Sequence, residues 1–575
     1  MKKRISVHSR KKTLLKNLFF FLVFFATSAL IFWKCRYGYG DIDESFYLTV
    51  PYRMCLGDAL FTDEWHLSQM AGFILYPFVW IYAKINGNLD GIILAARYLC
   101  TAIQCSIGMF IYFRTRKINW LGASVAAICY TLYIPFNITA LSYNSMGIMA
   151  LVVTLVILLT AETVLYLQYI IAGMFFAFAV LCNPYLLFVY LLYVLFVCTK
   201  SIIDQRISFD TCCITSLKGL LYITIGAVII AVIFLAFVFS RMSIIELIEA
   251  IPAILGDPEH THRSFAYKLY MFFNSIIIQR KRLLQPIYLA MSVLLLICLC
   301  DKERVKHKLM YFFTASLLTI CLMVIHFRIN YINHLMWSLN ILGPIIFLIS
   351  SDKSVKQIFY LLWLPGMLYA FCLHLSSNQT FYAISSASTV AIVGSILMLA
   401  LFAEECFEES DNAIIRNFVC LITAFMMLFQ ISTEALLRYK HIFWDSEIET
   451  QTCLIEHGIE AGIYVSEPKH KLYYDYLQNL SILHNYDAKK VLYLSDHTWF
   501  YLTDDYEFAC YSAWLSGVNE VTIARLKQYY SFNPEKMPDV VYVEIKNQQY
   551  AETFCKTFGY ASDQYEHCLV LTPIK

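Results

Sequence analysis

Long apolar runs separated by short polar loops are the feature that most constrains this chain. A helix that crosses a bilayer needs about 20 apolar residues, and runs of this kind recur between residues 14 and 436. The 575 residues are 59% hydrophobic but only 15% charged, whereas soluble domains carry roughly 25% charged residues. The sequence therefore predicts a polytopic α-helical membrane protein.

Basic clusters in short loops fix the expected topology, because Lys and Arg mark the cytosolic side. Placing the basic N-terminus and residues 302–308 inside predicts about thirteen crossings, with the first as an uncleaved anchor. Arg280-Lys281-Arg282 falls outside and breaks the rule. The expected crossings are residues 14–33, 89–113, 120–136, two within 147–181, 185–197, 220–239, 287–299, 310–325, one ending near 350, 358–375, one ending before 404, and 418–436.

The apolar segment at residues 67–85 is expected to lie in the outer interface and not to cross. If it crossed, the basic residues 114–117 would fall outside, against the charge rule. Trp65, Trp80 and Tyr82 are the expected amphipathic anchors of this helix.

An odd number of crossings with a cytoplasmic N-terminus places the tail outside the cytoplasm, so we expect a multi-pass plasma-membrane protein. Residues 1–437 form the membrane domain, with a first outer loop at 34–88, and residues 438–575 form an extracytoplasmic domain. Apolar runs at 462–466, 490–494 and 540–544 predict strands, and residues 470–484 and 521–530 predict helices. The tail is therefore predicted to be a small α/β domain.

Three carboxylates, Asp41, Asp43 and Glu44, follow the first apolar run directly. Carboxylates beside a membrane cost free energy unless they are hydrated, paired or bound to a cation. The alternative to a functional site is that these three carboxylates belong to a hydrated loop that happens to be acidic. Further landmarks follow in order: the turn Gly57-Asp58-Ala59-Leu60-Phe61-Thr62-Asp63, the interfacial helix, and Ala96-Arg97.

This order of landmarks resembles the GT-C superfamily of integral-membrane glycosyltransferases, which includes the protein O-mannosyltransferases and the bacterial lipid A aminoarabinose transferase. Those enzymes carry an Asp-Glu pair in the first outer loop, a Gly-x-x-Leu-Phe-x-Asp turn and an Ala-Arg at the second crossing. The resemblance covers residues 41–97 best, then the loop Ser142-Tyr143-Asn144 and the general layout. It implies transfer of a hexosyl or pentosyl group from a polyprenyl-phosphate donor to a glycan, lipid or protein of the bacterial envelope, usually with inversion.

Carried over to this chain, the resemblance makes Asp43 the general base, with Glu44 beside it. A departing lipid phosphate needs cations or hydrogen-bond donors, and Lys84, Arg97 and Arg263 are the candidates for this role. The chain lacks the Lys-Pro-Pro of the aminoarabinose transferases and has Trp65-His66-Leu67-Ser68-Gln69 there, which leaves the donor-phosphate ligand and the donor sugar open.

The segment Asp41-Ile42-Asp43 has the Asp-x-Asp form that holds a divalent cation in some glycosyltransferases. Other members of the superfamily work without a metal. Mg²⁺ or Mn²⁺ bound by Asp41 and Asp43 therefore stays an open alternative.

Two other functions compete with a glycosyltransferase. A transporter or flippase of lipid-linked glycans predicts ionisable residues near mid-membrane, and most crossings lack Asp, Glu, Lys and Arg. A non-catalytic scaffold for envelope assembly is the other competing function. Only a measurement of activity distinguishes it from the enzyme. A net charge of +2 without a basic stripe argues against nucleic acid as a partner.

Overall fold

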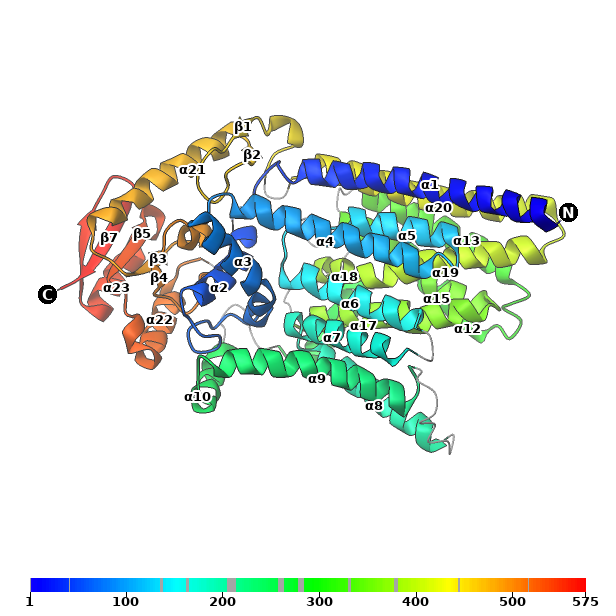
Figure 1. Cartoon of the computed structure of the whole chain (residues 1–575), viewed down its shortest axis with the longest axis horizontal. Coiled ribbons are helices and arrows are strands. Elements are labelled where there is room, and N and C mark those ends of the chain that lie inside the picture. The colour runs from blue at the N-terminus through cyan, green and yellow to red at the C-terminus, as the bar shows by residue number, and fades with distance from the viewer. Residues whose placement is uncertain are drawn as a thin grey trace.

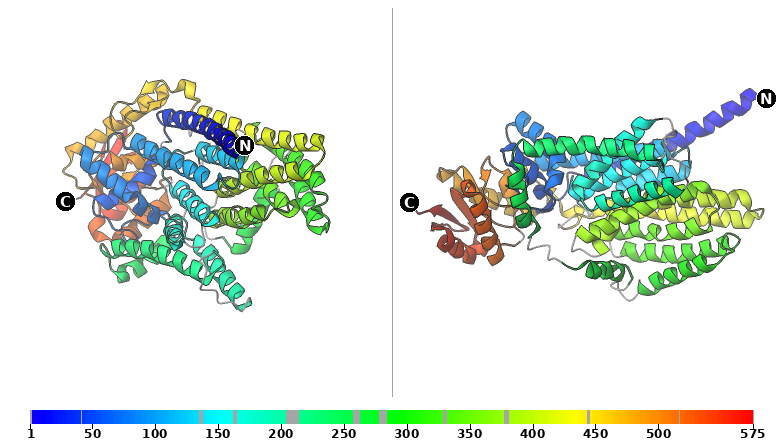
Figure 2. Two further views of the ribbon diagram at one scale, coloured as in Figure 1. Left: turned by 45° about the vertical axis from the view of Figure 1, so that its right-hand side comes forward. Right: turned by 90° about the horizontal axis from the view of Figure 1, so that it is seen from below.

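The structure, a computed structural model, is a long helical bundle with an α/β unit at one end (Figure 1). The N-terminus lies at the opposite end of the bundle, and two further views show the same separation (Figure 2). The residues that the structure describes are 2–40, 42–134, 138–161, 165–203, 214–256, 263–277, 284–328, 332–376, 381–442, 445–515 and 517–574.

Seven helices in the described part of the chain are long and apolar enough to cross a membrane. They are the span Leu14–Lys34 within α1 (Lys2–Lys34), α4 (Ile92–Thr115), α9 (Leu217–Phe239), α13 (Lys308–Arg328), the segment Lys353–Ser376, α19 (Thr389–Glu409) and α20 (Ala413–Lys440). The segment Lys353–Ser376 consists of α16 (Lys353–Ile358), a π-helical turn (Phe359–Trp363) and α17 (Leu364–Ser376).

Six shorter apolar helical segments complete the bundle. They are α5 (Trp120–Leu132), α6 (Tyr143–Leu159), α7 (Tyr166–Cys182), α8 (Leu186–Ile203), α12 (Gln285–Cys300), and the pair α14 (Ile332–Asn340) and α15 (Leu342–Ile349). The described residues thus hold seven candidate crossings and six shorter apolar helical segments, and the prediction of a polytopic helical fold is confirmed. Residues 280–282, where the charge rule failed, lie outside the described residues.

Two glycines let α7 and α9 pack closely. A Cβ atom on Gly226 would lie 1.9 Å from the carbonyl oxygen of Ile170, and one on Gly173 would lie 2.0 Å from that of Ile223. Small residues allow such backbone contact between membrane helices. Without them the two helices would have to separate.

The segment predicted to be the first outer loop, residues 34–88, contains α2 (Asp43–Cys55), a short 3₁₀ turn (Gln69–Ala71) and α3 (Gly72–Asn86). The predicted helix is present as α3, which is not among the candidate crossings of the described residues. Trp80 is exposed, but Trp65 is buried at 1% exposure and packs edge-to-face on Tyr529 of the tail. The expectation that Trp65 anchors the chain in the interface was therefore wrong.

The tail contains a five-stranded sheet in the order β4-β3-β5-β7-β6. Parallel pairs join β3 to β4 and to β5, and antiparallel pairs join β7 to β5 and to β6. The strands are β3 (Lys490–Leu494), β4 (Glu507–Phe508), β5 (Val540–Glu544), β6 (Tyr560–Gln564) and β7 (Cys568–Pro573), and the helices are α21 (Glu467–Leu480), α22 (Glu520–Phe532) and α23 (Gln548–Phe558).

The sequence predicted part of this tail. Strands β3 and β5 and helices α21 and α22 confirm the α/β prediction. The run at 462–466 contributes the short strand β2 (Tyr464–Val465), which pairs with β1 (Cys453–Leu454). Strands β4, β6 and β7 and helix α23 were not predicted. The remaining helices outside these groups are α10 (Ile244–Leu255), α11 (Phe265–Ile277) and α18 (Phe381–Ala387).

The tail and the first outer loop share one hydrophobic core. Leu48 and Tyr52 of α2 and Ile92 of α4 belong to the same buried cluster as Val491 and Tyr493 of β3. The loop is therefore shaped by the tail as well as by the bundle.

We expect Gly226→Val to destabilise the protein, because the new side chain would collide with the α7 backbone. Overpacking costs about 1–3 kcal/mol, so the midpoint of thermal unfolding in detergent should fall. Val228→Leu on the same helix is the control, since Val228 is 51% exposed. Equal midpoints for the two variants would contradict the close crossing.

Candidate active site

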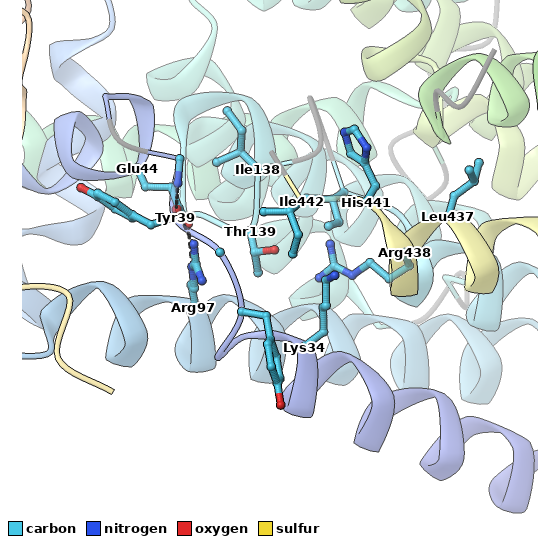
Figure 3. A pocket seen from close by; sticks show the side chains of 14 residues that line it. Lys34, Tyr39, Glu44, Arg97, Ile138, Thr139, Leu437, Arg438, His441 and Ile442 are labelled. Carbon is cyan, nitrogen blue, oxygen red and sulfur yellow. Dashed lines mark hydrogen bonds and ion pairs between the residues drawn. The ribbon is translucent and has the colours of Figure 1, made fainter. Parts of the chain in front are cut away.

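A cavity of ≈ 40 Å³ lies where α1, the first outer loop, α4 and α20 meet (Figure 3). Its polar lining includes the side chains of Lys34, Arg97, Arg438, His441 and Glu44. A water molecule occupies roughly 10–15 Å³ on this scale. The cavity therefore has room for a small ionic group but not for a whole sugar.

Two of the cations come from the ends of crossing helices far apart in the chain. Lys34 ends α1 and donates to the carbonyl oxygen of Tyr439 at 2.6 Å. Arg438 lies in the last turn of α20. The rings of Trp33 and Tyr439 stack with their centroids 5.8 Å apart, which holds the two helix ends together.

Arg438 is 3% exposed, and its Nε and Nη1 atoms have no hydrogen-bond partner among the described residues. An unpaired buried charge costs several kcal/mol. The guanidinium faces a cavity that could hold an anion, and such an anion would satisfy it.

Glu44 and Arg97 form a buried, bidentate ion pair. Arg97 donates from Nε to Glu44 Oε1 at 2.7 Å and from Nη2 to Oε2 at 2.5 Å. Arg97 also donates to the carbonyl oxygen of Cys35, and the Gly40 amide donates to Glu44 Oε2. Both oxygens of Glu44 are thus occupied, and the pair ties the start of α2 to α4.

The lining has an excess of positive charge. Lys34, Arg97 and Arg438 are formally three cations against the one carboxylate of Glu44. Partial burial and the nearby charge of Lys34 lower the pKa of His441, which favours its neutral form at pH 7. The cavity therefore suits an anion with more than one negative charge.

Asp43, the first residue of α2, has a different environment from Glu44. Its carboxylate makes no hydrogen bond or ion pair within the described part of the chain, which does not include Asp41. Burial, and then the negative charge of Glu44, raise the pKa of Asp43 to about 6. A carboxylate with this pKa can accept a proton near neutral pH.

The tail holds the segment that carries these carboxylates. Thr498 donates from Oγ1 to the carbonyl oxygen of Ile42 at 2.7 Å and lies 2.7 Å from Ser45 Oγ. Lys469 donates to the carbonyl oxygen of Tyr39 at 2.9 Å. The tail thereby holds the chain on both sides of Asp43.

The Gly-x-x-Leu-Phe-x-Asp turn has a structural role. Arg53 of α2 is fully buried and pairs with Asp58 at 2.8 Å and with Glu64 at 2.7 Å. Lys536 of the tail donates from Nζ to Oδ1, the other carboxylate oxygen of Asp58, at 2.5 Å. The turn thus connects α2 to the tail and does not line the cavity.

Of the predicted phosphate ligands, Arg97 lines the cavity, and Lys84 and Arg263 do not. Lys84 is exposed, with its Nζ 4.7 Å from the ring centroid of Trp80. Arg263 is exposed and donates to the hydroxyl of Tyr267. Residues 257–262, which directly precede Arg263, lie outside the described residues.

Sequence reasoning missed Lys34 and Arg438. One signal was available for Arg438: Gln430, Glu434 and Arg438 recur every four residues and so share one face of an otherwise apolar helix. Lys34 gave no such signal, because a lysine at a helix end is commonly an interface anchor.

The described residues do not fit a metal site at the acidic loop. They contain no group of three His, Cys, Asp or Glu side chains placed to hold an ion, and Arg97 occupies both oxygens of Glu44. Of the two proposed ligands, Asp41 and Asp43, only Asp43 lies within the described residues.

No family model matches the chain, and no curated protein matches it by sequence. The chain is similar to the solved oligosaccharyltransferase AglB from Archaeoglobus fulgidus, in complex with an inhibitory peptide and a dolichol-phosphate. Identity is 11%, coverage is 93% of this chain and 70% of AglB, and the TM-score is 0.46.

The chain is also similar to ArnT from Cupriavidus metallidurans bound to undecaprenyl phosphate. Here identity is 10%, coverage is 98% of each chain, and the TM-score is 0.45. At these identities and TM-scores the similarities concern general shape and assign no residue or substrate.

We expect Glu44→Gln to destabilise the protein, because it leaves the Arg97 charge buried and unpaired. Breaking a buried pair costs about 3–5 kcal/mol, which thermal unfolding in detergent would show as a lower midpoint. The double variant Glu44→Gln/Arg97→Gln should recover part of the loss. The exposed Glu447→Gln serves as control, and an unchanged midpoint for Glu44→Gln would contradict a structural role.

Proposed function

We propose that this protein is an integral-membrane glycosyltransferase that uses a polyprenyl-phosphate sugar as donor. The observation that carries the proposal is the buried Arg438 guanidinium, which lacks a hydrogen-bond partner at two of its nitrogens within the described chain and lines a cation-rich cavity. The cavity lies at the ends of two candidate crossings, α1 and α20. This is the level at which a membrane places the phosphates of its lipids.

Phosphate fits the cavity for reasons of charge and geometry. The planar guanidinium of Arg438 offers paired N–H donors that match phosphate oxygens. Lys34 adds an ammonium group, and the pairing of Arg97 with Glu44 leaves the charges of Lys34 and Arg438 uncancelled. These groups would stabilise a phosphate most strongly as it gains charge on leaving the sugar.

In the proposed reaction Asp43 is the general base. It takes the proton of an acceptor hydroxyl while the hydroxyl oxygen bonds to the anomeric carbon of the donor sugar. The bond between that carbon and the phosphate oxygen breaks, and the phosphate leaves with the electron pair beside Arg438 and Lys34. Attack from the side opposite the phosphate inverts the anomeric carbon. The support for this role is that Glu44, the next residue in the chain, lines the cavity, although Asp43 is not itself among the lining residues.

The acceptor is a hydroxyl-bearing glycan, lipid or protein of the cell envelope. The sugar is a hexose or pentose outside the phosphate cavity, on the side where Thr498 and Lys469 of the tail bind the loop. In this proposal the N-terminus is cytoplasmic, and the tail and the reaction share the extracytoplasmic compartment.

Asp43→Asn should lower transfer by about 10²–10⁴-fold, with the fold retained. For the wild type, kcat/KM should fall as the pH drops below about 6, because the base is then protonated. The assay measures undecaprenyl phosphate released from a panel of undecaprenyl-phosphate hexoses and pentoses. The exposed Asp90→Asn is the control. Unchanged transfer by folded Asp43→Asn would remove Asp43 from the reaction.

Arg438→Gln should weaken the binding of undecaprenyl phosphate by about 10–100-fold. A hydrogen bond to a charged group contributes about 1.5–3 kcal/mol, and each 1.4 kcal/mol is about tenfold in Kd. Lys440→Gln, two residues further on and exposed, should bind as the wild type does. Equal binding by both variants would place the phosphate elsewhere.

A further inference from the structure

Helix α10 follows the candidate crossing α9 after a turn of four residues. The turn is fixed by Arg241, which donates from Nη1 to the carbonyl oxygens of Met54 at 2.7 Å and Asp58 at 2.8 Å. A capping box between Ser243 and Glu246 then starts the helix. Its position at the end of a crossing is thus set by specific contacts with the first outer loop.

The orientation of α10 differs from that of the bundle helices. It lies crosswise at the end of α9 in Figure 1, whereas α9 runs along the bundle. If α9 crosses the membrane, α10 lies roughly in the membrane plane at its surface.

One face of α10 is covered by the tail. Ala250, Ala253 and Ile254 are buried in the core that the tail shares with the first outer loop. Arg525 of α22 donates to the carbonyl oxygens of Ala253 at 3.1 Å and Gly256 at 2.9 Å. These bonds join the C-terminal end of α10 to the tail.

The opposite face of α10 is exposed and aliphatic. Ile244, Ile245 and Ile248 are each at least 60% exposed, and Ile251 is 42% exposed. Their spacing places them on one side of the helix, and Ala250 and Ala253 lie on the other. A contiguous apolar face of this kind marks a protein or membrane contact.

We infer that this isoleucine face is a lipid-binding surface that inserts among the acyl chains of the leaflet on the tail side. The crosswise orientation and the direct continuation from α9 place it at that depth. It has no Trp, Tyr or Arg of the kind that dominates protein interfaces. Through Arg525, the inserted helix supports the tail that holds the Asp43 segment.

The test places p-benzoylphenylalanine at Ile248 of the full-length protein in phosphatidylcholine vesicles that contain an alkyne-tagged phosphatidylcholine. Illumination should attach the tagged lipid at position 248 at least about fivefold more than at Glu249, which is exposed but outside the isoleucine face. Ile244 is a second position on the same face, in case the Ile248 variant does not fold.

Equal lipid labelling at positions 248 and 249, or crosslinks from 244 and 248 to protein only, would overturn the inference. The readout needs no sugar transfer. Its failure would therefore leave the proposed function as it stands, and a failed transfer assay would leave the lipid surface as it stands.

Discussion

The ion pair between Glu44 and Arg97 is the contact on which the arrangement of the site depends. It joins the start of α2, in the first outer loop, to a helix of the bundle, and both side chains are almost completely buried. Because Glu44 is neutralised in this way, its carboxylate does not cancel the charges of Lys34 and Arg438. The cavity keeps its positive character although a carboxylate lines it.

The same contact separates the roles of two adjacent carboxylates. Glu44 is held by Arg97 and the Gly40 amide, whereas Asp43 has no such partner among the described residues. Burial without a partner favours the neutral form of a carboxyl group, so Asp43 titrates closer to neutral pH than an ordinary aspartate. Environments that shift the pKa values of two neighbouring titratable groups apart are a common basis for their separate acid and base roles.

Much of the fold could be predicted because the bilayer requires apolar runs of fixed length, and strands β3 and β5 are short apolar runs buried in the tail. Strand β6 was missed because four of its five residues are exposed and polar or small. Trp65 was predicted to lie in the membrane interface because an aromatic residue beside an apolar segment resembles an interface anchor. In the structure it is covered by the tail, which is far away in the sequence. Lys34 and Arg438 are about 400 positions apart, and no local pattern indicates that their helix ends meet.

The central claim is that Arg438 and Lys34 hold the phosphate of a lipid donor. The most direct measurement is an experimental structure of the protein with undecaprenyl phosphate. The proposal predicts phosphate density within hydrogen-bonding distance of the Arg438 guanidinium and Lys34 Nζ, with the polyprenyl chain leaving toward the membrane. Phosphate bound at Lys84 or Arg263, with the cavity between α1 and α20 unchanged, would contradict it.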